Sequence, residues 1–146
     1  ELAHYEWVEL ALDLDEAELD EVPADPNGDL LTGVPVWSPL AWPLAYSFPV
    51  QRIRPDFQPA EPGPDPTWLL VYRNRDDQVR FMQLSALPMR LAQLLQENSS
   101  DPGLSLLAAL AGELGFDHDP SFTRQGLALL EDWRQRDVIL GVQPRA

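Results

Sequence analysis

Two histidines, His4 and His118, are the side chains in this sequence best suited to proton transfer or metal binding near neutral pH. His118 stands between Asp117 and Asp119, and carboxylates beside an imidazole are a combination of metal ligands. Three adjacent residues of a loop rarely converge on one ion, however, and neither histidine has an evident partner in the sequence. We therefore predict no metal site and no cofactor from these residues.

A second acidic cluster, Asp25-Pro26-Asn27-Gly28-Asp29, is similar to part of a calcium-binding loop. Its glycine comes too early for the loop pattern, and Val36 occupies the position where a closing glutamate would coordinate the ion. A solvated turn is the better interpretation of this cluster.

No catalytic motif is present in the 146 residues. The sequence contains no HExxH zinc motif, no G-x-S-x-G nucleophile motif, no phosphate-binding glycine loop and no cysteine. A Ser/His/Asp or carboxylate-pair site stays open, because such groups converge in space rather than in sequence. We predict that the chain is not an enzyme, although an enzyme of another type would be revealed by a pocket with strongly perturbed titratable groups.

The net charge of −14 is unevenly distributed. Residues 1–30 contain eleven of the 24 acidic residues and no lysine or arginine, and all ten basic residues of the chain are arginines. An acidic segment repels phosphate backbones, so nucleic acid is an unfavoured partner. The lack of cysteine fits a cytoplasmic protein, and no apolar run reaches the length of a membrane span.

The centre of the chain predicts a β-hairpin followed by a helix. Two runs rich in β-branched and aromatic residues, Trp68–Tyr72 and Val79–Leu84, flank the polar stretch Asn74–Asp77. Ser85 can accept a hydrogen bond from the amides of a following helix, whose first turn contains Pro88. Leucines recur there at helical spacing, at Leu87, Leu91, Leu94 and Leu95.

Two more helices and a strand should follow. Asp101-Pro102 and Asp119-Pro120 each begin an apolar helical pattern, Gly115 ends the first, and Val138–Val142 has the composition of a short closing strand. The order strand, strand, three helices and strand predicts an α+β fold, a winged-helix-like domain with a small antiparallel sheet.

The first part of the chain should precede that domain as a helix and a strap. Leu2–Leu14 is apolar over most of its circumference, so it predicts a helix with partners on two sides. One partner is expected to be the body of this chain, and the other a missing upstream domain or a second copy in a homodimer. Eleven of the fifteen prolines lie between Pro23 and Pro66, which predicts an extended strap with at most edge strands such as Tyr46–Ile53 and an exposed connector at Gln58–Pro66. We expect 1–33 to be the end of a truncated helical domain and 34–146 to be the winged-helix-like domain with its strap.

Two binding functions compete on this scaffold. A winged-helix DNA-binding regulator would use Pro120–Arg136 as its recognition helix, but the three arginines of this helix are balanced by Glu131, Asp132 and, just beyond the helix, Asp137. A peptide could instead add as a strand to an exposed sheet edge beside the third helix. The candidate peptide-binding residues are Phe81 and Gln83 from the hairpin, and Leu127, Leu130 and Arg134 from the helix.

Several separated motifs, in order, resemble the C-terminal half of the HvfC family. They are Ser38-Pro39-Leu40-Ala41, the stretch from Tyr46 to Ile53, and the stretch from Leu69 to Met82. The opening His4–Ala11 resembles the end of that family's helical N-terminal domain.

The resemblance implies a non-catalytic partner of a multinuclear iron enzyme of the HvfB/MbnB type. Members of the family are related to MbnC of methanobactin synthesis. Together, the family member and its iron enzyme modify cysteines of a ribosomally made precursor peptide. The hairpin and three helices are also similar to the PqqD type of leader-peptide-recognition element. The family's N-terminal domain has long been labelled a DNA-binding domain, which keeps the regulator as the alternative.

Overall fold

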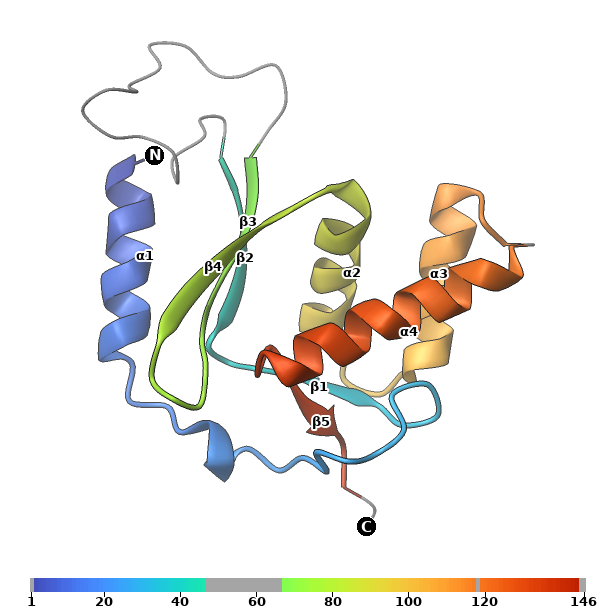
Figure 1. Ribbon diagram of the computed structural model, residues 1–146, viewed down its shortest axis with the longest axis horizontal. Coiled ribbons are helices and arrows are strands. Elements are labelled where there is room, and N and C mark those ends of the chain that lie inside the picture. The colour runs from blue at the N-terminus through green and yellow to red at the C-terminus, as the bar shows by residue number, and fades with distance from the viewer. Residues whose placement is uncertain (1, 47–66, 118, 145–146) are drawn as a thin grey trace.

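The computed structural model describes residues 2–46, 67–117 and 119–144 (Figure 1). Along these ranges the elements are α1 (Leu2–Leu14), the short 3-10 helix η1 (Leu19–Glu21), β1 (Pro35–Trp37), β2 (Ala41–Tyr46), β3 (Thr67–Arg73), β4 (Val79–Leu84), α2 (Ala86–Glu97), α3 (Gly103–Leu114), α4 (Pro120–Gln135) and β5 (Ile139–Val142). The predicted α+β fold is confirmed.

The hairpin forms the centre of a three-stranded antiparallel sheet with the order β2-β3-β4. Trp68 lies opposite Leu84 and Arg73 lies opposite Val79, so the two strands are in register over their length. The loop between them is closed by the side chain of Asn74, whose Oδ1 accepts hydrogen bonds from the backbone amides of Asp76 and Gln78 at 3.0 Å each. The predicted hairpin and its polar loop are therefore confirmed.

Side chains of β3 alternate between two apolar cores. Leu70 and Tyr72 pack into a core shared with α2, α3 and α4, whereas Leu69 and Val71 pack into a core shared with α1. Figure 1 shows the corresponding layers, with α1 on one side of the sheet and the other three helices on the other side. The sheet is therefore covered on both faces, which explains why β3 is almost entirely buried.

The closing strand pairs outside this sheet. β5 lies antiparallel to β1, with Pro35 opposite Val142, and forms a separate two-stranded sheet. The sequence correctly indicates a strand at this position, and the predicted small antiparallel sheet is formed by β2, β3 and β4. The pairing of β5 with β1 is not indicated by the sequence. Trp37 of β1 packs edge to face on the buried Trp133 of α4, with ring centroids 5.7 Å apart, which joins the small sheet to the helical core.

The capping residues predicted for the ends of α2, α3 and α4 are found in part. Asp119 caps α4, because its side chain accepts a hydrogen bond from the amide of Ser121 at 2.9 Å, and Gly115 ends α3 in the left-handed conformation at φ 78°. Ser85 lies at the predicted start of α2 but makes no side-chain capping bond. At α3 the N-terminal capping residue is Pro102, the second residue of the predicted pair Asp101-Pro102, and no side-chain capping bond forms there.

The described part of the proline-rich strap contains no α-helix, as predicted. Its described strands are Pro35–Trp37 and Ala41–Tyr46. The second forms one edge of the main sheet, so the predicted strand Tyr46–Ile53 begins where this strand ends. The rest of that prediction, and the connector Gln58–Pro66, lie outside the described residues. The division at residues 33 and 34 stays a prediction.

Candidate peptide-binding site

Strand β4 forms the second edge of the main sheet, because β3 is its partner in the strand order. The amide of Asn74 donates to the carbonyl of Gln78, and in an antiparallel pair bonded and non-bonded residues then alternate. By this alternation Arg80 bonds to β3, whereas the N–H and C=O groups of Val79 and Phe81 point away from the sheet. An extended segment could pair with these outward groups.

Phe81 is the large apolar side chain at this edge. Its ring packs edge to face against Tyr5 of α1, with centroids 6.0 Å apart, yet 49% of the residue is exposed. The contact with α1 orients one side of the ring, and the other side remains open to a ligand. Phe81 is therefore a suitable apolar anchor.

A hollow of about 500 Å³ lies beside this edge, where the hairpin approaches the C-terminal end of α4. The residues that line it are mostly polar: Tyr72, Asn74, Asp76, Gln78, Arg80, Phe81, Gln135, Arg136 and Asp137. Arg136 donates to the carboxylate of Asp132 at 3.0 Å and also bonds Tyr72. The hydrogen bond with Tyr72, followed by that with Asp132, raises the pKa of Arg136, so its guanidinium stays charged.

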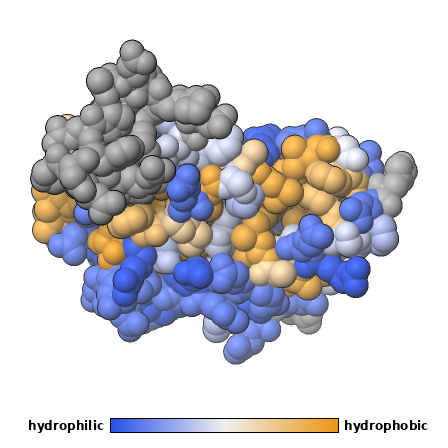
Figure 2. All heavy atoms as spheres, turned by 45° about the horizontal axis from the view of Figure 1, so that its top comes forward, coloured by the Kyte–Doolittle hydropathy of each residue, from blue (hydrophilic) through white to orange (hydrophobic). Residues whose placement is uncertain are grey.

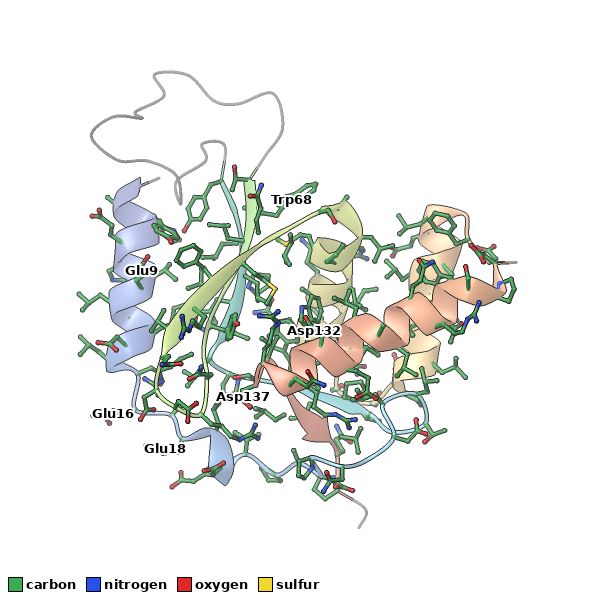
Figure 3. All side chains as sticks on the ribbon, in the orientation of Figure 1. Glu9, Glu16, Glu18, Trp68, Asp132 and Asp137 are labelled. Carbon is green, nitrogen blue, oxygen red and sulfur yellow. The ribbon has the colours of Figure 1, made fainter. Side chains whose placement is uncertain are left out.

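The hollow is preformed because the hairpin loop is bound to the end of α4. The backbone amide of Arg75 donates to Asp137 Oδ2 at 2.9 Å, and the guanidinium of Arg75 pairs with both Asp137 and Asp20. Asp137 follows the helix in the left-handed conformation, with φ 64°. Figure 3 shows Asp132 and Asp137 at this end of α4, on the side of the hairpin.

A family model described as the HvfC C-terminal domain matches residues 38–134, which is well over half of the chain. The chain belongs to this family. The match runs from the residues before β2 through the hairpin and nearly the whole of α4. None of the curated proteins matches the sequence. Membership in the HvfC C-terminal domain family suggests an accessory role related to the maturation of ribosomally made peptides, and not catalysis by this chain.

The structure of this HvfC C-terminal domain separates the five predicted peptide-binding residues. Phe81 and Gln83 alternate with Met82, whose side chain packs into the core of α2, α3 and α4, so they lie on the α1 face of the sheet. Leu127 and Leu130 belong to the opposite core, and Leu130 is 1% exposed. Of the five, Phe81 lines the hollow.

Arg134 has an internal structural role. It donates from Nη1 to the carbonyl of Gly28 at 2.6 Å and pairs with Glu131 at 2.8 Å. It thereby holds the acidic turn at Asp25–Asp29 against α4. Asp25 accepts a hydrogen bond from the backbone amide of Asn27 within the turn, and Asp29 accepts one from the amide of Leu31, just after it, at 2.8 Å. These bonds agree with the interpretation as a turn rather than a calcium loop.

The polar lining of the hollow was not identified from the sequence. Tyr72, Arg80, Gln135 and Arg136 come from a hairpin and a helix end that are far apart in the chain. An arginine and a tyrosine on neighbouring strands indicate a polar edge, but no pattern along the chain says which helix end lies beside it.

Of the two histidines considered for proton transfer or metal binding, only His4 lies within the described residues. His4 Nδ1 lies 2.8 Å from the hydroxyl of Tyr46, so His4 has a partner that sequence spacing did not reveal. Its neighbour Tyr5 is buried, and this burial, with a hydrogen bond to Glu9, raises the pKa of Tyr5. Across the described ranges no three histidine, aspartate or glutamate side chains are arranged to hold a metal ion, and His118 lies outside those ranges.

Among the helices of residues 2–46, 67–117 and 119–144, none combines the length and apolar character needed to cross a bilayer.

Proposed function

We propose that this chain is a non-catalytic accessory subunit that presents a ribosomally made, cysteine-containing precursor peptide to a multinuclear iron enzyme of the HvfB/MbnB type. The observation that carries the proposal is the edge of β4, where outward backbone groups, a half-exposed Phe81 and a preformed hollow lie together. Family membership supports the accessory role.

In this proposal the leader part of the peptide adds to β4 as a further antiparallel or parallel strand. The outward N–H and C=O groups of Val79 and Phe81 supply main-chain hydrogen bonds, and these bind the peptide backbone irrespective of its sequence. Alternate side chains of the peptide then contact either the ring of Phe81 or the polar hollow at Arg80 and Arg136. The partner enzyme supplies the iron chemistry.

The backbone part of the interaction can be tested by replacing Phe81 in two ways. Phe81→Ala removes the ring but keeps the outward amide, whereas Phe81→Pro also removes the amide, which β3 does not use. Gln125→Ala, an exposed position on α4, is the matched control.

Affinity for the precursor peptide encoded beside this chain is measured by calorimetry, with the iron enzyme present. We expect Phe81→Ala to weaken binding about tenfold, which corresponds to ~1.4 kcal/mol, Phe81→Pro to weaken it further, and Gln125→Ala to leave it unchanged. Unchanged affinity in both Phe81 variants would exclude β4 as the binding edge.

A complex with the iron enzyme is the second requirement of the proposal. Co-purification of the two proteins is expected, followed by peptide binding to the pair. Absence of a complex, together with retention of a DNA probe at physiological salt, would favour the winged-helix regulator instead. On α4, Arg134 and Arg136 are paired with Glu131 and Asp132, which leaves little positive charge for phosphates.

A further inference from the structure

A second hollow, of about 360 Å³, lies between α3 and the first half of α4, away from the edge of β4. Its apolar lining includes Leu107 and Ala111 of α3 and Phe122 of α4, while Leu104 and Phe116 lie at its margins. Phe116 stacks on Phe122, with ring centroids 5.4 Å apart. Figure 2 shows an apolar area at this end of the molecule. We call this hollow the α3–α4 groove.

Helix α3 is apolar on its outer face as well as on its buried face. Leu104 and Leu114 of the helix are 48% and 41% exposed, and Phe116, just beyond its end, is 43% exposed. The one charged residue of the helix, Glu113, is held by Arg90 through two hydrogen bonds of 2.8 Å. A helix that is apolar all round normally has partners on both sides, and here Leu104 and Leu114 stay nearly half exposed.

Gly112 gives a reason to expect another backbone in the α3–α4 groove. A Cβ atom added at Gly112 would meet only Asp117 Oδ1, at 4.0 Å, whereas one at Gly103 would lie 1.8 Å from the carbonyl oxygen of Leu30. Glycine destabilises a helix interior relative to alanine, and the fold itself does not require it at position 112. Together with Ala108, one turn earlier, it leaves a smooth surface on which a second helix could pack closely.

The groove is negatively charged at one end. Asp117 and Asp119 line it beside Phe116. Hydrogen bonds from the hydroxyl and amide of Ser121 lower the pKa of Asp119, so its carboxylate is ionised at neutral pH. Arg124 also acts on Asp119 and lowers its pKa, so two carboxylates and one guanidinium lie at this end, and a ligand with positive charge is favoured there over one with negative charge.

We propose that the α3–α4 groove binds an amphipathic helix of a partner protein, with leucine-like side chains over Ala108 and Gly112 and a lysine or arginine at Asp117 and Asp119. Helix α3 has 12 residues, about 18 Å of length, which matches three turns of a bound helix. This binding is separate from peptide addition at β4.

The occupant is not the N-terminal helix of a second copy. Exposed apolar residues of α1, such as Trp7 and Leu10, could enter an apolar groove, but residues 1–30 contain no lysine or arginine and eleven acids. Those acids would face Asp117 and Asp119, and the repulsion disfavours the contact. A different protein with a basic amphipathic helix fits the charge.

The test uses two synthetic 14-residue helical peptides of leucine, alanine and one charged residue type, lysine in the first and glutamate in the second. Each is titrated into the ¹⁵N-labelled chain, and amide shifts are recorded. We expect the lysine peptide to bind at least tenfold more tightly than the glutamate peptide and to shift the amides of Ala108, Gly112 and Phe116. Asp117→Asn should reduce that preference several-fold.

Gly112→Leu fills the groove without entering the core, and Ala109→Leu adds the same bulk to an exposed position of α3 that does not line it. Loss of lysine-peptide binding in Gly112→Leu alone, with both variants folded by circular dichroism, is the expected result. Equal loss in both variants, equal binding of both peptides, or shifts at Trp7 and Leu10 instead would overturn the proposal. Phe81→Pro should bind the lysine peptide normally, so failure of the β4 proposal leaves this result unaffected.

Discussion

Arg73 Nη1 donates a hydrogen bond of 2.6 Å to the carbonyl oxygen of Leu12, which joins the last residue of β3 to the C-terminal turn of α1. The same guanidinium also reaches the carbonyls of Asp15, at 2.7 Å, and Ala17, at 2.9 Å. Arg73 is 6% exposed; its bond to Leu12 is buried, and those to Asp15 and Ala17 are partly buried. One side chain thus satisfies carbonyls that the end of a helix leaves without partners, and its positive charge complements the negative end of the helix dipole.

We predict that Arg73→Met lowers the free energy of unfolding by about 2–4 kcal/mol, because it leaves several buried carbonyls without donors. Arg73→Lys should recover only part of this loss, since a lysine cannot donate to all the carbonyls at once. Urea unfolding of each variant measures the change. Arg80→Met, at an exposed position of β4, is the control and should change stability by less than about 0.5 kcal/mol. A similar effect of both methionine variants would contradict the special role of Arg73.

Alanine variants of Leu130 and Phe81 should separate an effect on folding stability from an effect on peptide binding. Leu130 is 1% exposed in the core, so Leu130→Ala should lower the free energy of unfolding by about 2–5 kcal/mol, whereas Phe81→Ala, at a half-exposed position, should lower it far less. Peptide affinity is then measured at a temperature where both variants are folded. We expect affinity to fall in Phe81→Ala and to be retained in Leu130→Ala. The opposite pattern would place the peptide against α4.

The cap of α4 should make stability depend on pH. The pKa of Asp119 is lowered from its usual 3.8, chiefly by the side-chain hydrogen bond with Ser121. A lowered carboxyl pKa contributes stability that is present above pH 3.8 and is lost as the pH falls through the folded-state value. Asp119→Asn still caps the helix but does not titrate. The stability difference between the native chain and this variant should therefore shrink below pH 4, and a difference independent of pH from 6 to 2 would refute the prediction.

The outer face of α1 should associate with other surfaces. Trp7, Leu10 and Leu14 are 59%, 56% and 67% exposed, and they recur at helical spacing opposite the buried Tyr5, Val8 and Leu12. We predict that the chain forms dimers at high concentration, and that added salt strengthens them because it screens the acidic N-terminal segment. Trp7→Glu should abolish the dimer while leaving the fold intact. Light scattering across a concentration series measures this, and a strictly monomeric native chain would disprove it.

Local sequence signals were reliable where they acted within one element. The hairpin with its loop at Asn74, the three helices that follow and the caps at Gly115 and Asp119 were all predicted from short patterns. Patterns failed where long-range pairing decided the outcome. Nothing in Ile139–Val142 indicates that its partner is Pro35–Trp37, more than a hundred residues earlier, rather than the nearby hairpin.

The candidate site shows the same division. Phe81 was identified because the second strand of the hairpin was expected to offer an exposed sheet edge to a peptide, and the structure places Phe81 at such an edge. Gln83, Leu127 and Leu130 were grouped with it because a cleft was expected between the third helix and the sheet edge. Gln83 shares the α1 face of the sheet with Phe81, but the position of α4 places Leu127 and Leu130 in the core on the opposite face. Arg134 was interpreted as a ligand contact, and its partners are Gly28 and Glu131.

The sequence by itself determined the local elements, the acidic N-terminal segment and the two apolar faces of α1, because hydrophobic periodicity and turn chemistry act over a few residues. The tertiary structure alone decided that Arg73 would bind the end of α1, that Asp137 would hold the hairpin loop, and that α3 and α4 would form a groove between them. Each of these depends on contacts between residues far apart in the chain, whose geometry is set only when the two faces of the sheet are packed.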